Sequence, residues 1–225
     1  MLAKLWFSLV RFGFRLLYYE FAWTYDVVSW VVSLGDWRRW QMAAIPFVSG
    51  RDVLEIGHGP GHMLLALQNA RFEVIGLDLS PFMGRQAQNR TQRTIPLVRG
   101  MVQDLPFEAA VFDTVLSTFP TDYIVDPATL AEVARVLREN GRFVIVPEGH
   151  LTGGGTVTRF IEWLFAITGQ RYPVKDIDQA EISHESIWHP YLQRFEEAGF
   201  VVGFELVQLE RSALTVVIAE KEAEA

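Results

Sequence analysis

The sequence of 225 residues contains no cysteine. Disulfide frameworks, thiolate zinc sites and cysteine nucleophiles are therefore excluded, and the chain is compatible with a reducing compartment. Its aromatic N-terminal part also has no long apolar run, because Lys4, Arg11, Arg15, Glu20 and Asp26 interrupt it. A membrane-spanning helix needs about 20 mostly apolar residues, and a signal peptide needs an unbroken apolar centre and a cleavage site. We therefore expect a cytoplasmic protein.

Positive charge is scarce beyond the N-terminal part. The whole chain has a net charge of −7, and residues 1–48 carry five basic and three acidic side chains, so the remaining 177 residues carry −9. Nucleic-acid binding depends on clustered lysine and arginine, so no nucleic-acid partner is expected. Half of all residues are hydrophobic, which is enough for a sizeable core. The length suggests one domain with an appendage.

Residues 1–48 are the predicted appendage, and they hold 13 of the 29 aromatic side chains. Lys4, Ser8, Arg11 and Arg15 recur at helical spacing and would form one stripe on a largely apolar helix. Such a helix either lies at a membrane surface, where its basic residues meet anionic headgroups, or braces its own domain as a lid. Both interpretations stay open, with peripheral membrane contact assigned to residues 1–20.

Two further helices are predicted before residue 48. One runs over about residues 25–34 and ends at Gly35, where glycine tolerates the backbone conformation of a helix end. Asp36 is expected to cap the next helix, which ends before Pro46. Residues 1–48 are thus predicted to be a helical lid or membrane-surface segment.

Residues 49–225 alternate short apolar runs with helical patterns. The predicted strands are 53–56, 72–77, 95–99, 112–117 and 142–146, and the predicted helices are 61–69, 81–92 and 127–138, the last ended by Asn140-Gly141. This alternation is typical of a parallel sheet with helices on both faces. Two longer runs, 200–209 and 213–219, are joined by three residues, which favours a closing antiparallel hairpin.

A glycine-rich turn follows the first predicted strand. It reads Leu54-Glu55-Ile56-Gly57-His58-Gly59-Pro60-Gly61-His62. Ligands of open parallel sheets bind beyond the carboxyl ends of the strands, where glycines let the backbone approach them closely. A dinucleotide fingerprint would need glycine at position 62, where His62 stands, so a nicotinamide-dependent oxidoreductase is disfavoured. Asp78 ends the second strand, where an acid can accept hydrogen bonds from ribose hydroxyls.

The segment from Val53 to Gly61 resembles the glycine-rich motif of class I S-adenosylmethionine-dependent methyltransferases. Residues 74–78, 97–107, 112–117 and 136–142 resemble the following motifs of that family in order, so the likeness covers about residues 50–150. The resemblance implies a Rossmann-like α/β fold with a seven-stranded sheet, mostly parallel with the last strand antiparallel. It also implies S-adenosylmethionine as the methyl donor.

The resemblance also implies a set of cofactor contacts. They are Glu55, Gly57, His58, Gly59, Gly61, Asp78, Leu79, Met101, Val102 and Thr118. By position in the family, Glu55 and Gly57 lie near the methionine end of the cofactor and Asp78 binds its ribose. The family commonly has Gly-Asp-Ala before a Leu-Pro-Phe triplet, whereas here Gly100 is followed by Met101.

The methyl acceptor is expected at the same edge of the sheet. Tyr25, Phe119 and Tyr123 are the predicted substrate contacts. Candidate bases at this edge are His58 and His62 after the first strand, residues 118–123 after the fourth, and Glu148 with His150 after the fifth. Glu148 and His150 are the predicted base pair. Methyl transfer from a sulfonium depends mainly on in-line positioning and exclusion of water, so no covalent intermediate is required. Nothing completes a metal site around this pair, so no metal is predicted.

Residues 147–190 are predicted as a cap insertion, with a Gly153–Gly155 hinge followed by an apolar helix. Apolar lid segments favour a hydrophobic methyl acceptor over a sugar or a nucleotide. Tyr25-Asp26, Ser33-Leu34-Gly35 and Arg38-Arg39-Trp40 resemble the N-terminal region of the ubiquinone and menaquinone C-methyltransferases, with Ser29 in place of the usual asparagine. Bacterial phospholipid N-methyltransferases have a similar architecture.

The leading hypothesis is therefore a methyltransferase that acts on a small hydrophobic or lipid-like acceptor, such as a quinol, a phenol, a thiol or a phospholipid amine. The alternative is a non-catalytic interaction protein that keeps the methyltransferase fold. The acceptor atom and the oligomeric state are left open by the sequence.

Overall fold

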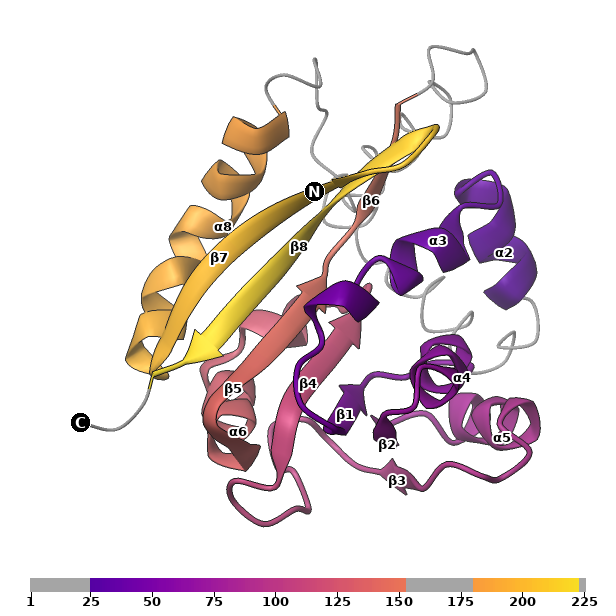
Figure 1. Ribbon diagram of the computed structural model, residues 1–225, viewed down its shortest axis with the longest axis horizontal. Coiled ribbons are helices and arrows are strands. Elements are labelled where there is room, and N and C mark those ends of the chain that lie inside the picture. The colour runs from indigo at the N-terminus through magenta and orange to yellow at the C-terminus, as the bar shows by residue number, and fades with distance from the viewer. Residues whose placement is uncertain (1–24, 153–179, 223–225) are drawn as a thin grey trace, which may run out of the picture.

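A computed structural model describes residues 25–152 and 180–222 (Figure 1). The predicted amphipathic helix within residues 1–20 and most of the predicted cap lie outside this part. The strands are β1 (Asp52–Ile56), β2 (Glu73–Asp78), β3 (Leu97–Arg99), β4 (Phe112–Thr118), β5 (Leu137–Val146), β6 (Gly149–Leu151), β7 (Phe200–Gln208) and β8 (Ser212–Lys221). The α-helices are α2 (Tyr25–Val32), α3 (Trp37–Met42), α4 (His62–Asn69), α5 (Pro81–Arg90), α6 (Pro127–Val136) and α8 (Ala180–Glu197), with 3-10 turns η2 (Ile45–Phe47) and η3 (Asp122–Val125).

The strands form one sheet in the order β3-β2-β1-β4-β5-β8, and β7 pairs with the outer edge of β8. The pairs from β3 to β5 are parallel, and β8 is antiparallel to both β5 and β7. This is the predicted α/β fold, and the closing antiparallel hairpin is confirmed. The parallel arrangement of β2, β1 and β4 brings the carboxyl ends of these three strands together at one edge of the sheet.

The short strand β6 was not predicted, and it continues β5 along the same edge of β8. Ile145 pairs with Val217, and Gly149 pairs with Leu214, so four steps on one strand match three on the other. An extra residue of this kind is a β-bulge, which reverses the face to which the following side chains point. The side chains after β5 therefore point to the opposite face of the sheet from the one that a regular strand would give them.

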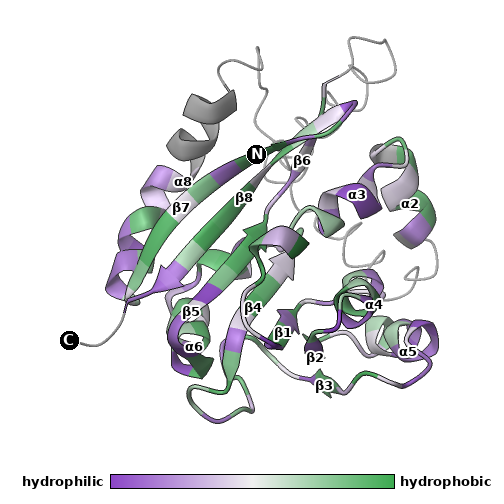
Figure 2. Ribbon diagram, viewed as in Figure 1, coloured by the Kyte–Doolittle hydropathy of each residue, from purple (hydrophilic) through white to green (hydrophobic). Residues whose placement is uncertain are grey.

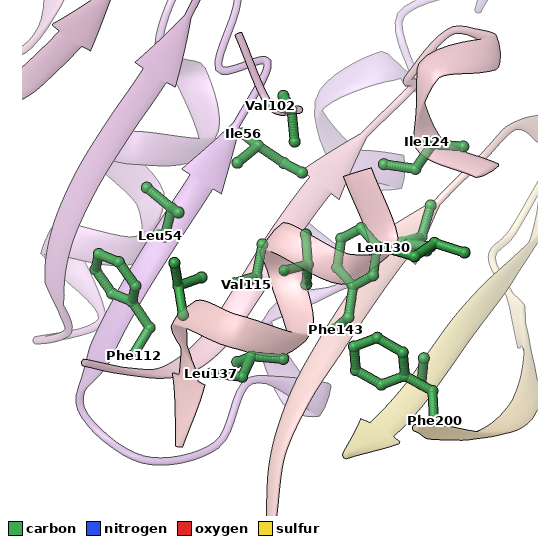
Figure 3. Close-up of a cluster of buried hydrophobic side chains, with 14 of the residues drawn as sticks. Leu54, Ile56, Val102, Phe112, Val115, Ile124, Leu130, Leu137, Phe143 and Phe200 are labelled. Atoms are coloured by element: carbon green, nitrogen blue, oxygen red, sulfur yellow. The ribbon is translucent and has the colours of Figure 1, made fainter. Parts of the chain in front are cut away.

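Helices cover both faces of the sheet, each over its own core (Figure 1). On one face, α6 and α8 pack over Phe143, Phe200 and their neighbours, and Figure 3 shows these side chains gathered between strands and helix. On the other face, α3, α4 and α5 cover a second cluster that includes Val144 and Leu214. Because β5 and β8 have apolar side chains on both faces, Figure 2 shows them largely in the hydrophobic colour.

The predicted end of the third helix is wrong. We placed it at Asn140-Gly141, but α6 ends at Val136 and β5 already begins at Leu137. Leu137 is completely buried and pairs with Phe112, so burial of its side chain in the sheet outweighs the helical pattern. Asn140 still adopts a positive φ of 58°, but it does so within the irregular start of β5 rather than at a helix end.

The segment before residue 49 shares a core with the sheet. Trp40 of α3 is completely buried, and its indole N–H donates to the Ser212 hydroxyl at 2.8 Å. Asp36 precedes α3 as predicted, but its side chain makes no capping hydrogen bond and instead accepts one from Ser212 at 3.1 Å. Among the described residues, we find no helix that is both long and apolar enough to cross a bilayer.

Candidate functional site

A cavity of about 360 Å³ lies where the carboxyl ends of β1, β2 and β4 meet. It is lined by Gly57, Gly59, Leu77, Asp78, Leu79, Ser80, Gly100, Met101, Val102, Gln103, Thr118, Phe119, Pro120, Thr121 and Tyr123. Seven of the ten predicted cofactor contacts are in this set, together with two of the three predicted substrate contacts. The structure therefore brings residues from four separate stretches of chain into one space.

The three glycines of the turn after β1 have positive φ angles, but their surroundings differ. A Cβ atom on Gly57 would lie 2.5 Å from the Tyr123 hydroxyl oxygen, and one on Gly61 would lie 2.8 Å from the Ala87 Cβ of α5. These two positions need glycine for packing. A Cβ on Gly59 would meet no atom within 4 Å, so Gly59 presents its backbone to open space beside the cavity.

Asp78 connects the glycine turn with the loop after β2. Its Oδ2 accepts a hydrogen bond from the Gly59 N–H at 2.9 Å, and its Oδ1 accepts one from the Ser80 N–H at 2.7 Å. Ser80 in turn caps α5 by accepting from the Met83 N–H. Each carboxylate oxygen can accept a further hydrogen bond, so the half-buried Asp78 is able to receive ligand hydroxyls on its cavity side.

Glu55 is a completely buried carboxyl group at the end of β1. Neither of its oxygens makes a hydrogen bond of normal geometry. Burial raises the pKa of Glu55 well above its ordinary value, the negative charge of Asp78 raises it further, and the Leu64 N–H in the first turn of α4 opposes the rise. A buried acid without hydrogen bonds is costly, so a cationic group bound over the glycine turn would stabilise its charged form.

The two histidines of the turn are both held by neighbours. His58 is buried beneath the turn with Nδ1 2.7 Å from the Gly59 carbonyl oxygen, and it does not line the cavity. His62 lies at the start of α4, where its Nε2 is 2.8 Å from Asp26 Oδ1 of α2. Arg90 of α5 donates to Asp26 Oδ2 at 2.6 Å and also to the Pro60 carbonyl oxygen. Asp26 thereby fixes α2 to the glycine turn.

Charges and burial set the protonation of this cluster. Burial alone would raise the pKa of Asp26, but the hydrogen bond from His62 and the charge of Arg90 outweigh it and hold this pKa below its ordinary value. Burial lowers the pKa of His62, the positive charges of Arg90 and Arg38 lower it further, and Asp26 opposes them. His62 is therefore expected to be neutral near pH 7, as a donor to the Asp26 carboxylate.

Aromatic side chains from α3 pack against Phe119, which lines the cavity. The ring of Trp37 stacks on the cavity-lining ring of Phe119 with centroids 4.0 Å apart, and Trp40 lies 6.2 Å from both rings. The Gln41 side-chain amide donates to the Thr118 hydroxyl at 3.2 Å. Phe119 has a φ of 53°, an uncommon conformation for a bulky residue, which this packing holds in place.

The rim and the floor of the cavity differ in exposure. Leu79 and Met101 are exposed, whereas Val102 is buried among core residues. The Tyr123 hydroxyl lies over the Gly57 turn, 3.4 Å from the Ser117 hydroxyl, which donates to the Ile56 carbonyl oxygen at 3.1 Å. The cavity thus has a polar wall near the glycine turn and apolar side chains at its mouth.

The predicted base pair forms, but outside the lining of this cavity. His150 Nε2 lies 3.2 Å from Glu148 Oε1. A Cβ on Gly149 would point at the Trp40 ring, so the bulge turns the side chains on either side of it to the opposite face. Tyr25 is the first residue of α2, and its side chain lies outside the described part of the structure.

Three cavity residues lie outside the predicted sites. Leu77, Ser80 and Gly100 line the cavity because they lie at or just after the ends of β2 and β3. Gln103, Pro120 and Thr121 line it as well, next to predicted contacts in the loops after β3 and β4. Their place after a strand was a usable signal, since parallel strands end at one edge. Trp37 and Gln41 carried no comparable signal, because only the packing of α3 on the end of β4 brings them to the site.

Comparison with known proteins agrees with this geometry. Residues 53–141 match the model of a methyltransferase domain family. The chain is 29% identical to the demethylmenaquinone methyltransferase of Symbiobacterium thermophilum over 90% of each chain. It is 30% identical to the enzyme of the same name from Lactiplantibacillus plantarum, over 78% of this chain and 82% of the relative.

A solved structure supports the fold alone. The YcgJ protein of Bacillus subtilis superposes with a TM-score of 0.57 at 17% identity, covering 83% of this chain and 99% of the other.

The strand order, the glycine turn after β1 and the acid Asp78 after β2 agree with the family match. Together with the relatives, they identify the protein as an enzyme. The chain belongs to the class I S-adenosylmethionine-dependent methyltransferases.

Proposed function

We propose that this methyltransferase acts on a hydrophobic, quinol-like acceptor. The observation that carries the proposal is an aromatic wall at Phe119, which lines the same cavity as Gly59 and Asp78. The ring of Trp37 packs against Phe119 and supports it, with centroids 4.0 Å apart. A flat aromatic acceptor can stack on such a wall at little conformational cost. The relatives named demethylmenaquinone methyltransferase support the same acceptor class.

In this proposal, the polar half of the site holds the methyl donor. When bound, S-adenosylmethionine supplies a methyl group on a positively charged sulfur. Asp78 accepts hydrogen bonds from ribose hydroxyls, and Gly59 lets the backbone approach the ligand because no side chain intervenes. Glu55 provides negative charge beneath the turn and compensates for a cationic part of the ligand.

The aromatic half orients the acceptor and excludes water. Phe119 and Tyr123 lie on the wall next to the polar turn, so an acceptor stacked there has its ring beside the donor. Most of the rate enhancement then comes from holding the acceptor atom in line with the methyl group and its leaving sulfur. Exposed Leu79 and Met101 at the mouth provide apolar contacts for a hydrophobic substituent.

In this proposal Glu148 and His150 take up the acceptor's proton; because neither lines the cavity, the acceptor extends beyond it to reach them after the end of β5. A quinol ring attacks a methyl group more readily once a hydroxyl proton has been removed, and a carboxylate beside an imidazole is a common proton acceptor. The distance of 3.2 Å between His150 Nε2 and Glu148 Oε1 allows Glu148 to orient the imidazole ring. The hydroxyl proton would pass to His150 as a ring carbon takes the methyl group and the bond from that group to sulfur breaks. The hydrogen on that ring carbon would then leave as a proton and the oxygen would regain one, which restores the aromatic quinol.

The experiment is an acceptor panel with the full-length protein. S-adenosylmethionine is incubated separately with a short-chain naphthoquinol, a simple phenol, an alkyl thiol and phosphatidylethanolamine, and methylated products are identified by mass spectrometry. The quinol is expected to give the highest kcat/KM, with the methyl group on carbon. A preference for the thiol or for the phospholipid amine contradicts the quinol proposal while leaving the methyltransferase activity intact.

His150→Gln tests the base assignment with the preferred acceptor. The variant should bind S-adenosylhomocysteine normally, because His150 does not line the cavity. Its kcat with this acceptor should fall by about 100-fold. An unchanged kcat would show that His150 does not accept the proton.

A further inference from the structure

Helix α2 has its polar and apolar sides reversed relative to an ordinary surface helix. Val27, Trp30 and Val31 have 62%, 64% and 50% of their surface exposed, and Val28 and Leu34 are exposed as well. These residues recur at intervals of three and four, so they form one continuous apolar strip along the outside of the helix. Figure 2 shows the hydrophobic colour on this helix at the periphery of the molecule.

The polar residues of α2 are buried or fixed to the protein. Ser29 and Ser33 are both buried, and their hydroxyls donate to the Asp26 and Ser29 carbonyl oxygens at 3.1 and 2.7 Å. The Asp26 carboxylate binds His62 and Arg90. Polar atoms that have hydrogen-bond partners within the protein can be buried without a large cost in free energy. The orientation of α2 is therefore fixed by specific bonds, and the exposure of its apolar strip follows from them.

The exposed charges that follow this strip in the chain are basic. Asp36 is the only acidic residue in the stretch 27–42, and it is buried with 2% exposure. Arg38 and Arg39, which follow α2, are exposed. Arg39 is paired with Asp36 at 3.4 Å and with the exposed Glu210 at 3.7 Å, so Arg38 is the basic side chain offered to a partner. Basic side chains beside an apolar strip are complementary to an anionic lipid surface, which offers phosphate groups outside and acyl chains beneath. This local charge is opposite in sign to the −7 of the whole chain.

We propose that the outer face of α2, made of Val27, Val28, Trp30, Val31 and Leu34, docks on an anionic lipid bilayer. The helix has eight residues, so it lies in the interface and does not cross the bilayer. Arg38 contacts lipid phosphates beside it. This surface differs from the predicted membrane contact of residues 1–20, because it belongs to a helix held on the methyltransferase fold.

The attachment of α2 to the glycine turn places this docking face close to the active site. Asp26 contacts both His62, at the start of α4, and Arg90, which also binds the Pro60 carbonyl oxygen of the turn. A lipid-like acceptor could then enter the site from the bilayer without crossing water. This last consequence rests on the proposed function, whereas the docking itself does not.

The test is flotation with vesicles of equal parts phosphatidylglycerol and phosphatidylcholine, using the full-length chain. Val31→Glu is compared with Val201→Glu, which is the same substitution at a similarly exposed valine, 50% against 57%, on β7. Val31→Glu should reduce the vesicle-bound fraction about tenfold, because a charged group replaces buried apolar surface. Val201→Glu should float as the wild type does, and vesicles of phosphatidylcholine alone should bind the wild type more weakly.

Three outcomes overturn the proposal. One is equal flotation of Val31→Glu and the wild type. Another is a wild type that does not float although it binds S-adenosylhomocysteine normally. The third is a wild-type dimer that Val31→Glu converts to a monomer in gel filtration without any loss of flotation, which would assign the face to a second copy. Methylation of a short-chain quinol without vesicles is measured in parallel, so that a failure of docking is distinguished from a failure of the proposed activity.

Discussion

The Asp78 carboxylate accepts a hydrogen bond of 2.9 Å from the Gly59 N–H and thereby joins the ends of β1 and β2. These two residues lie 19 positions apart, yet each carries one of the two features that the proposed cofactor site requires. Gly59 supplies open backbone, and Asp78 supplies an acceptor for hydroxyl groups. A ligand that binds Asp78 therefore also contacts a turn that Asp78 itself holds in place.

Asp78→Asn should weaken binding of S-adenosylhomocysteine by about tenfold or more, because a charge-assisted acceptor is lost. Stability should fall by roughly 1–3 kcal/mol, since one backbone N–H then faces an amide donor. Isothermal titration calorimetry and urea unfolding measure the two effects.

Asp113→Asn is the matched control for this prediction. Asp113 accepts hydrogen bonds from the backbone N–H groups of Arg51 and Asp52, at 2.7 and 2.9 Å, near the amino end of β1. The substitution should lower stability by a comparable amount and leave the affinity unchanged. Equal losses of affinity in both variants would show that Asp78 acts only through general stability.

Gly59→Ala should reduce the affinity for S-adenosylhomocysteine by about tenfold, because the new methyl group projects into open space beside the cavity. The stability cost should be only roughly 1–2 kcal/mol, the cost of an L-residue at a positive φ. Gly199→Ala is the control, because Gly199 also has a positive φ and an unobstructed Cβ position, in the turn between α8 and β7. If both variants lost affinity equally, the cavity next to Gly59 would not be the cofactor site.

Glu55→Gln should stabilise the ligand-free protein, and more so at high pH. Burial raises the pKa of Glu55 above its ordinary value, so its folded form favours the proton and loses stability as the pH rises above about 4.5. The neutral amide avoids this loss. Melting temperatures should therefore differ little at pH 5 and by an amount equivalent to at least about 1 kcal/mol at pH 8. A difference independent of pH would contradict the burial of a titrating carboxyl group.

Phe119→Gly should be more stable than Phe119→Ala by about 1 kcal/mol, although both variants lose the stacking on Trp37. The reason is the φ of 53° at Phe119, which glycine adopts without strain. Urea midpoints give the comparison. Both variants should also raise the KM for a quinol acceptor, and a greater stability of the alanine variant would show that the backbone relaxes when the ring is removed.

Much of the proposed cofactor site could be predicted from the sequence, because its residues follow strands directly. Gly57, Gly59 and Asp78 each lie within a few positions of a strand end, and parallel strands end at one edge of the sheet. His58 has the same placement, yet its ring is buried against Gly76 of β2 rather than in the cavity. Position in the chain therefore fixes the edge at which a residue lies, but not the direction of its side chain.

The part of the site that we propose for the methyl acceptor depends on contacts between distant parts of the chain. Gln41 reaches Thr118 across 77 residues, and Trp40 reaches Ser212 across 172. No local pattern encodes these distances, because side-chain packing and not backbone periodicity selects the partner. The same is true of α2, whose apolar strip would suggest a buried face until the bonds of Asp26 turn that strip outward.

Local sequence thus specified the glycine turn, the acid after β2 and the order of helices and strands, since each depends on residues near one another in the chain. Tertiary packing determined the directions of the side chains around the site. The bulge after β5 turned Gly149 toward Trp40 and the side chains of Glu148 and His150 to the other face. Such choices depend on how β8, α3 and β5 fit together, and their energies come from burial and hydrogen bonds between segments that meet only in the folded chain.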